Sequence, residues 1–173
     1  MSGWLRRNRW FLVALAVLIP TALVVSLTPR FLPYLETQPQ AETVALGELV
    51  RYAGADIELT DLETLDGDEW NAPQGADIVV ATLAIRVVDP PEFTSCEITL
   101  VASAKTGYER EWTADSFTDS DYDIPDRFET LCVLNEAGTY DLQLTFLVPR
   151  GEVADAVVQF SASAALPRVL RLS

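Results

Sequence analysis

Histidine is absent from this chain of 173 residues, and its absence excludes several kinds of chemistry. Ser-His-Asp triads, Cys-His nucleophiles and histidine-ligated zinc sites all need an imidazole. No serine lies in a Gly-x-Ser-x-Gly turn, and the sequence has no glycine-rich phosphate loop. A pair of carboxylates could serve a glycosidase, but 26 acidic residues produce such pairs by chance. We therefore expect a non-enzymatic protein with no cofactor and no small-molecule substrate.

Basic residues are also scarce, and they are unevenly placed. The chain has 12 Lys and Arg against 26 Asp and Glu, a formal net charge of −14. Arg6, Arg7 and Arg9 lie within the first ten residues, whereas every acidic residue lies at or after Glu36. A surface of this sign repels phosphate backbones, so we expect no nucleic-acid partner.

Charge is missing altogether from residues 10–27, which run from Trp10 to Leu27. A helix of this length spans about 27 Å, close to the hydrocarbon thickness of a bilayer. Pro20 lies in the middle, where a membrane helix accepts a kink. The arginines ahead of this run place the N-terminus in the cytoplasm. We therefore predict that residues 1–28 are a basic tip and a transmembrane signal-anchor helix, which binds the lipid bilayer through residues 10–27.

A cleaved secretory signal is the competing interpretation, since it shares the basic start and the apolar middle. Residues 26–28 match the small-residue cleavage pattern poorly, and Pro29 follows them. No cysteine lies near the end of the run, which excludes a lipoprotein anchor. Both interpretations export the rest of the chain, so we predict a single-pass protein of the cell membrane with an extracytoplasmic C-terminal domain.

The exported part begins with a predicted proline-containing stalk, residues 29–42, followed by a domain at residues 43–173. In residues 140–148, apolar and polar side chains alternate with the period of a half-buried strand. Residues 77–88 are apolar on almost both faces, which is typical of a central strand. Further strand-like runs are residues 47–52, 56–65, 96–104, 128–134, 157–162 and 168–172. Seven or eight strands without an amphipathic helix indicate an all-β sandwich.

Residues 136–142 resemble the tyrosine corner of immunoglobulin-type domains, with Tyr140 as the structural tyrosine. Leu142 takes the place of the second cysteine of antibody domains, so the usual disulfide between the sheets is absent. The pattern predicts an immunoglobulin-like β-sandwich.

Four stretches carry a resemblance to a known family: residues 46–48 (LGE), 57–63 (IELTDLE), 78–88 (IVVATLAIRVV) and 145–149 (TFLVP). Across about residues 44–173 the chain resembles the actinobacterial membrane-anchored immunoglobulin-like proteins of the type called domain of unknown function 4352. It departs from them at residues 89–91 (DPP), where the family has an asparagine-rich turn. The resemblance implies an extracytoplasmic sandwich and no agreed activity.

Two cysteines, Cys96 and Cys132, lie in the part that we expect to be exported. An even count in an oxidising compartment favours a disulfide between them. The alternatives are two free buried thiols or a metal pair, for which the chain supplies no histidine.

Three carboxylates, Asp119, Asp121 and Asp123, alternate like the start of a calcium loop. Ile124 and Thr130 stand where an EF-hand needs glycine and glutamate, which excludes that motif and leaves a solvated loop or a looser calcium site.

Trp70 and Trp112 lie in predicted loops flanked by acidic residues. Each could cap an edge of the sandwich or serve as an exposed aromatic anchor for a partner. The sequence thus favours an interaction module that docks as an accessory subunit onto another membrane or envelope protein. A ligand-binding or sensing module for calcium or a cell-envelope glycan is the alternative.

Overall fold

The computed structural model describes residues 7–8, 10, 15–21, 39–92, 94–103, 108–114, 120–151 and 155–173. The chain divides into two units, Met1–Gln38 and Pro39–Ser173. In the first unit residues 15–21 are helical, and the Thr21 hydroxyl donates to the Val17 carbonyl at 2.7 Å. Among the residues described, no helix has both the length and the apolar character needed to cross a membrane.

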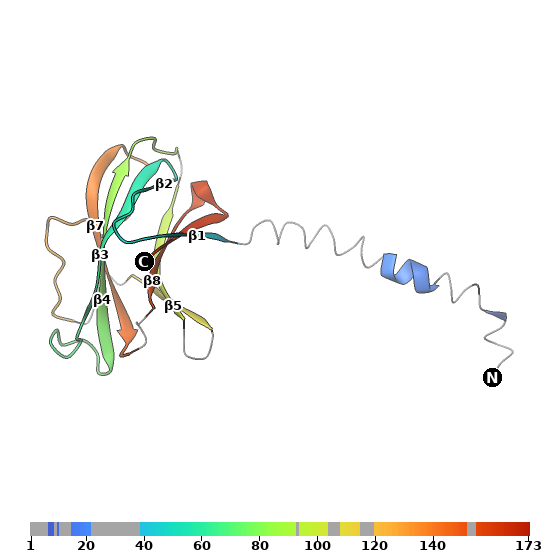
Figure 1. The fold of residues 1–173 in the computed structure, drawn as a ribbon, viewed down its shortest axis with the longest axis horizontal. Helices are drawn as coiled ribbons and strands as arrows, with labels where there is room; N and C mark the ends of the chain where they lie inside the picture. Colours follow the sequence, from blue (N-terminus) through green and yellow to red (C-terminus); the bar gives the residue numbers. More distant parts are fainter. Residues whose placement is uncertain are drawn as a thin grey trace. The chain divides into compact units, whose positions relative to one another are not determined.

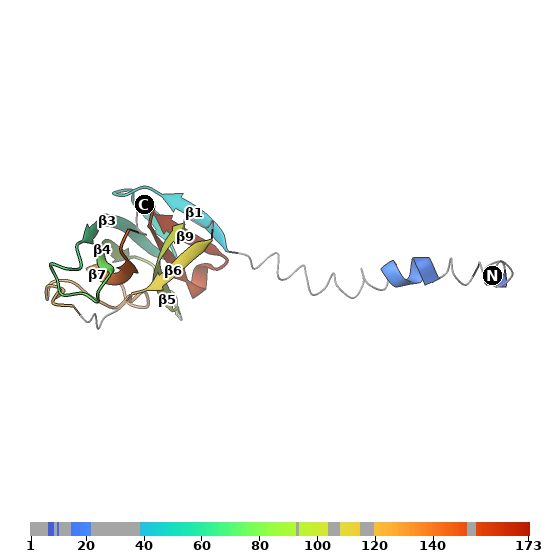
Figure 2. The same ribbon diagram turned by 90° about the horizontal axis from the view of Figure 1, so that it is seen from below.

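The described part of the second unit contains nine strands in two sheets, and Figures 1 and 2 show these sheets facing each other. The strands are β1 (Gln40–Val44), β2 (Val50–Tyr52), β3 (Ala55–Leu65), β4 (Ala76–Val87), β5 (Cys96–Ser103), β6 (Glu109–Thr113), β7 (Gly138–Pro149), β8 (Val157–Ala162) and β9 (Arg168–Leu172). Their orders are β1-β9-β8-β5-β6 and β2-β3-β4-β7. The all-β sandwich is confirmed, but the prediction of seven or eight strands is wrong by at least one.

The core forms because each inner sheet face is apolar at every second position. On β7 the alternate residues Leu142, Phe146 and Val148 are at most 1% exposed and belong to the central cluster. Leu100 on β5 and Phe160 on β8 meet them from the five-stranded sheet and are fully buried. Removal of these side chains from water supplies the main favourable free energy of folding.

Strand β4 shows why the prediction of a two-sided apolar strand was right. Its first half is buried on both faces, and Ile78 and Val80 are at most 5% exposed although they lie outside the central cluster. Its second half alternates, with Ile85 buried and Arg86 exposed. Something must therefore cover the outer face of the four-stranded sheet beside Ile78 and Val80, but not beside Arg86.

Tyr52 connects the two sheets through its buried ring and its hydroxyl. The ring lies on β2, is 1% exposed and meets the Phe160 ring edge-on at 5.9 Å. The Tyr52 hydroxyl donates to the Arg168 carbonyl at 2.6 Å and accepts from the Ala162 N–H at 3.0 Å. Burial raises the pKa of Tyr52, because an ionised oxygen would lose its water.

The first and last strands of the domain, β1 and β9, pair in parallel, with Gln40 opposite Arg168 and Val44 opposite Leu172. Strand β1 therefore begins three residues before the predicted domain boundary at residue 43, and residues 40–42 of the predicted stalk belong to the sheet.

Two sequence predictions about strands need correction. Residues 128–134 form no strand; only Glu129 makes an isolated parallel bridge, to Leu142 on β7. Conversely, the charged run Glu109–Thr113 is strand β6, which pairs antiparallel with β5. Trp112 thus lies on an edge strand rather than in a loop, half-buried against the central cluster.

The predicted disulfide is confirmed: Cys96 and Cys132 are bonded, with their Cα atoms 6.1 Å apart. Cys96 begins β5, and Cys132 lies in the connection between β6 and β7. The bond therefore ties that connection to the five-stranded sheet.

Reducing this disulfide should lower the free energy of unfolding by about 4 kcal/mol, because the unfolded chain regains the freedom of a loop of about 36 residues. Urea unfolding followed by tryptophan fluorescence, with and without reductant, measures the change. The double variant Cys96→Ser/Cys132→Ser should have the urea midpoint of the reduced protein, and reductant should not change that midpoint. Equal urea midpoints for oxidised and reduced wild-type protein would contradict the prediction.

Candidate functional site

Residues 120–134, which we call the strap, contact the outer face of the four-stranded sheet at Tyr122 and the edge of β7 at Glu129. The Tyr122 hydroxyl donates to Gln143 Oε1 at 3.2 Å, and Gln143 Nε2 donates to Thr82 Oγ1 at 3.1 Å. Gln143 is 7% exposed and alternates with the core side chains of β7, so it points outward. The strap therefore accounts for polar residues that are buried outside the core.

Trp70 packs against the strap instead of standing free. Its ring lies edge-on to Tyr122 with centroids 5.3 Å apart, and its carbonyl accepts from the Asp121 N–H at 2.8 Å. The turn between β3 and β4, which carries Trp70, is thereby joined to the strap. Burial raises the pKa of Tyr122, and the nearby charges of Glu63 and Asp61 raise it further.

The predicted calcium ligands are only partly within the described chain. Asp121 Oδ2 accepts from Asn71 Nδ2 at 2.5 Å, so its carboxylate helps to hold the same turn. Asp123 is exposed, and Asp119 lies outside the described residues. In the ranges that the structure describes, no three acidic, cysteine or histidine side chains are grouped to hold a metal ion.

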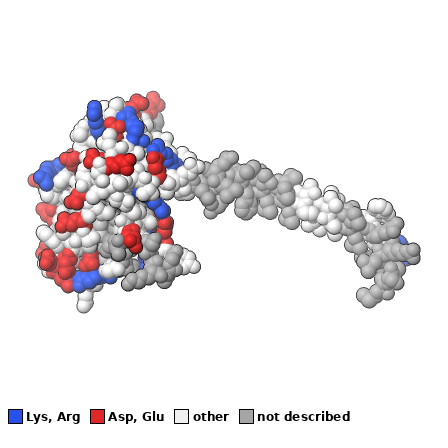
Figure 3. Space-filling model, viewed as in Figure 1, with Lys and Arg blue, Asp and Glu red and all other residues white. Residues whose placement is uncertain are grey.

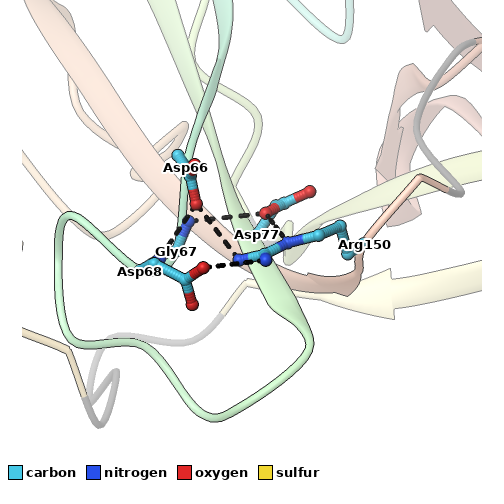
Figure 4. Close-up of polar contacts among 5 residues, drawn as sticks. All are labelled: Asp66, Gly67, Asp68, Asp77 and Arg150. Atoms are coloured by element: carbon cyan, nitrogen blue, oxygen red, sulfur yellow. Dashed lines mark hydrogen bonds and ion pairs between the residues drawn. The ribbon is translucent and has the colours of Figure 1, made fainter.

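A cluster that sequence reasoning missed surrounds Arg150, directly after β7 (Figure 4). Its guanidinium donates to Asp66 Oδ1 at 3.1 Å, to Asp68 Oδ2 at 2.9 Å and to Asp77 Oδ1 at 3.0 Å. Ala76 pairs with Pro149, which brings the Arg150 cluster together from distant parts of the chain. Hydrogen bonding from Arg150, and then its charge, lower the pKa of Asp68. The guanidinium of Arg150 thus occupies the space between the three carboxylates, an arrangement that we call the Arg150 clamp.

Tyr140 is hydrogen-bonded to the strap through its hydroxyl. Its hydroxyl donates to the Val133 carbonyl at 2.7 Å and accepts from the Val133 N–H at 2.9 Å. Tyr140 is half-buried, and burial raises its pKa. The tyrosine thus fixes the end of the strap to β7.

Beside Tyr140 the strap presents the largest exposed apolar side chains of this region. Leu131 is 70% exposed and Val133 is 40% exposed, whereas Leu134, at the end of the strap, packs into the core and is 2% exposed. A groove of about 270 Å³ adjoins them, and its acidic lining residues are Glu129 and Glu136. The four consecutive apolar residues 131–134 signal this arrangement, because an extended segment cannot bury both of its faces at a sheet edge.

Carboxylates dominate the remaining surface, as the composition predicts. Figure 3 shows Asp and Glu side chains spread over the visible face, with basic side chains between them. Several basic residues are already bonded: both Arg171 terminal nitrogens donate to the Glu109 carboxylate at 2.8 and 2.9 Å, and Arg168 Nε donates to Glu42 at 2.6 Å.

Half of the predicted topology and anchor residues lie outside the described residues. Arg6, Arg9 and Leu27 lie outside the described residues. Arg7, Trp10 and Pro20 are described, with Trp10 74% exposed and Pro20 in the helical residues 15–21.

No protein-family model and no curated protein matches the chain. Among solved structures, it is similar to an uncharacterized β-sandwich protein from Clostridium difficile 630, with 14% identity and a TM-score of 0.44 over 78% of this chain and 95% of that one. It is also similar to the yjhA protein from Bacillus subtilis, with 8% identity and a TM-score of 0.42 over 75% of this chain and 98% of that one. Function must therefore be argued from the chain's own residues.

The Arg150→Gln variant should unfold at a lower temperature than wild type at neutral pH, and the difference should shrink in acid. Because the folded pKa of Asp68 lies below its unfolded value, the clamp stabilises fully above about pH 4 and is lost as the pH falls through the folded pKa. Melting followed by circular dichroism at pH 7 and in the range below pH 4 measures this. Arg86→Gln, at an exposed position of β4, is the matched control and should show no such pH-dependent difference.

Tyr140→Phe should lower the free energy of unfolding by about 1 kcal/mol, because it removes both hydrogen bonds to Val133. Amide hydrogen exchange at Val133 should also become faster. Tyr108→Phe is the control, since Tyr108 is 77% exposed. Unchanged exchange at Val133 in the Tyr140 variant would show that the Tyr140 hydroxyl does not hold the strap.

Proposed function

We propose that this chain is a membrane-anchored extracytoplasmic interaction module that docks as an accessory subunit onto another membrane or envelope protein. The observation that carries the proposal is the exposure of Leu131 and Val133 on a segment tied to both sheets. Exposed apolar side chains held in fixed positions bind a partner without first losing conformational freedom.

Export is supported by two independent features. The disulfide suits an oxidising compartment, since cytosolic thiols are usually kept reduced. Residues 10–27 remain free of charge and follow three arginines, the order that leaves the N-terminus in the cytoplasm. We therefore propose a transmembrane signal anchor at residues 1–28.

The immunoglobulin-like assignment is also part of this proposal. Parallel pairing of β1 with β9 places the first and last strands side by side in one sheet. The Tyr140 hydroxyl bonds back to a backbone group seven residues upstream, as a tyrosine corner does.

The alternative, a calcium- or glycan-binding module, has less support. The residues that suggest it are Asp119, Asp121 and Asp123 for calcium and Trp70 and Trp112 for a glycan. Of these, Asp121 and Trp70 hold each other's loops. A docking role leaves both residues as structural supports.

Full-length protein with a tag at each end should stay with membranes after a carbonate wash. In whole cells whose outer layers admit protease but whose cytoplasmic membrane is intact, added protease should remove the C-terminal tag. It should spare the N-terminal tag, which serves as the internal control. Chemical crosslinking in the same membranes should give an adduct larger than the monomer. Protection of the C-terminal tag, release by carbonate, or recovery of monomer alone would each contradict the proposal.

A further inference from the structure

The exposed part of the strap is held in place at three points. Glu129 exchanges two backbone hydrogen bonds with β7, to the Asp141 carbonyl at 2.8 Å and from the Gln143 N–H at 2.9 Å. Cys132 is bonded to β5 through the disulfide, and Val133 is held by Tyr140. Leu131 lies between the first two of these attachments. Its side chain is therefore exposed on a backbone that is fixed on both sides.

Within this segment, inward and outward residues alternate. Cys132 and Leu134 belong to or pack against the central cluster, whereas Leu131 and Val133 point to solvent. Single exposed leucines are ordinary on protein surfaces, but two neighbours on a braced segment beside a groove of about 270 Å³ form a preorganised apolar contact.

The charges of this groove have one sign. Glu129 and Glu136 line it, and in the described part of the chain neither forms an ion pair. The strap's own cation, Arg127, lies over the Phe128 ring, 4.7 Å from its centroid. A partner of opposite charge would therefore gain attraction here without displacing an existing ion pair.

We infer that this groove is the docking surface of the proposed interaction module, and that its occupant is a basic segment of another protein. An apolar side chain of that segment packs between Leu131 and Val133, and flanking Lys or Arg side chains pair with Glu129 and Glu136. This inference rests on the proposed function and specifies the chemistry of the partner.

The test places a photoreactive benzophenone side chain at position 131 of the full-length protein in its native membranes. The matched control carries the same group at Leu49, which is 63% exposed in the connection between β1 and β2. Position 131, and not position 49, should crosslink to a protein, and mass spectrometry should find Lys or Arg near the crosslinked residue. Crosslinks to lipid, to a second copy of this chain, to a segment without basic residues, or to nothing would overturn the inference.

Charge is tested separately with Glu129→Gln/Glu136→Gln. This variant should reduce the crosslink yield at position 131 about tenfold and remove its dependence on salt, because rim charges govern encounter with a charged partner. Glu97→Gln/Glu111→Gln changes the net charge equally on the exposed surface of β5 and β6 and should leave the yield unchanged. Equal crosslink yields in both variants would overturn the inference that the partner segment is basic.

Failure of this inference is distinguishable from failure of the proposed function. A larger adduct with a chemical crosslinker, together with no photoproduct at position 131, would keep the docking role and reject this surface. Absence of both products would reject both. Unchanged thermal midpoints of the variants show that each is folded.

Discussion

The disulfide between Cys96 and Cys132 is the constraint around which the rest of the domain is arranged. It joins the long connection between β6 and β7 to the first residue of β5, in the opposite sheet. With that end secured, the strap can lie over the outer face of the four-stranded sheet and still return to begin β7. The strap thereby does three things at once: it buries outward-facing side chains, bridges the edge of β7 and displays Leu131 and Val133.

The strap and the turn between β3 and β4 form a second, smaller layer of packing outside the sandwich core. Trp70 and Tyr122 join the turn after β3 to the strap, and the Arg150 clamp joins the same turn to the end of β7. Exposed ion pairs of this kind contribute little singly, but three carboxylates sharing one guanidinium restrict a turn that has few buried contacts. The turn between β3 and β4 is thus braced, while the proposed docking surface lies at the start of β7.

Much of the fold was predictable because burial imposes a short repeat on the sequence. Residues 140–148 alternate so regularly that β7 was expected almost as it occurs, and the two-sided apolar run at 77–88 correctly indicated the central strand β4. Strand β6 was missed because its charged residues carry no such repeat; pairing with β5 alone makes it a strand. Residues 128–134 have a strand's composition, but only Glu129 bridges to β7, and Cys132 is bonded to β5 in the other sheet.

The all-β class and the lack of histidine could be read from residue order and composition, and the count of two cysteines favoured the disulfide that the structure contains. Which side chains meet depends instead on how the strands pair in the folded domain. Trp70 and Asp121 came together across 51 residues, and Arg150 reached carboxylates 73 to 84 residues away, through strand registers that no local pattern encodes. The tertiary structure likewise decided that Leu131 and Val133 face water, since that depends on which face of the strap the core and the disulfide take.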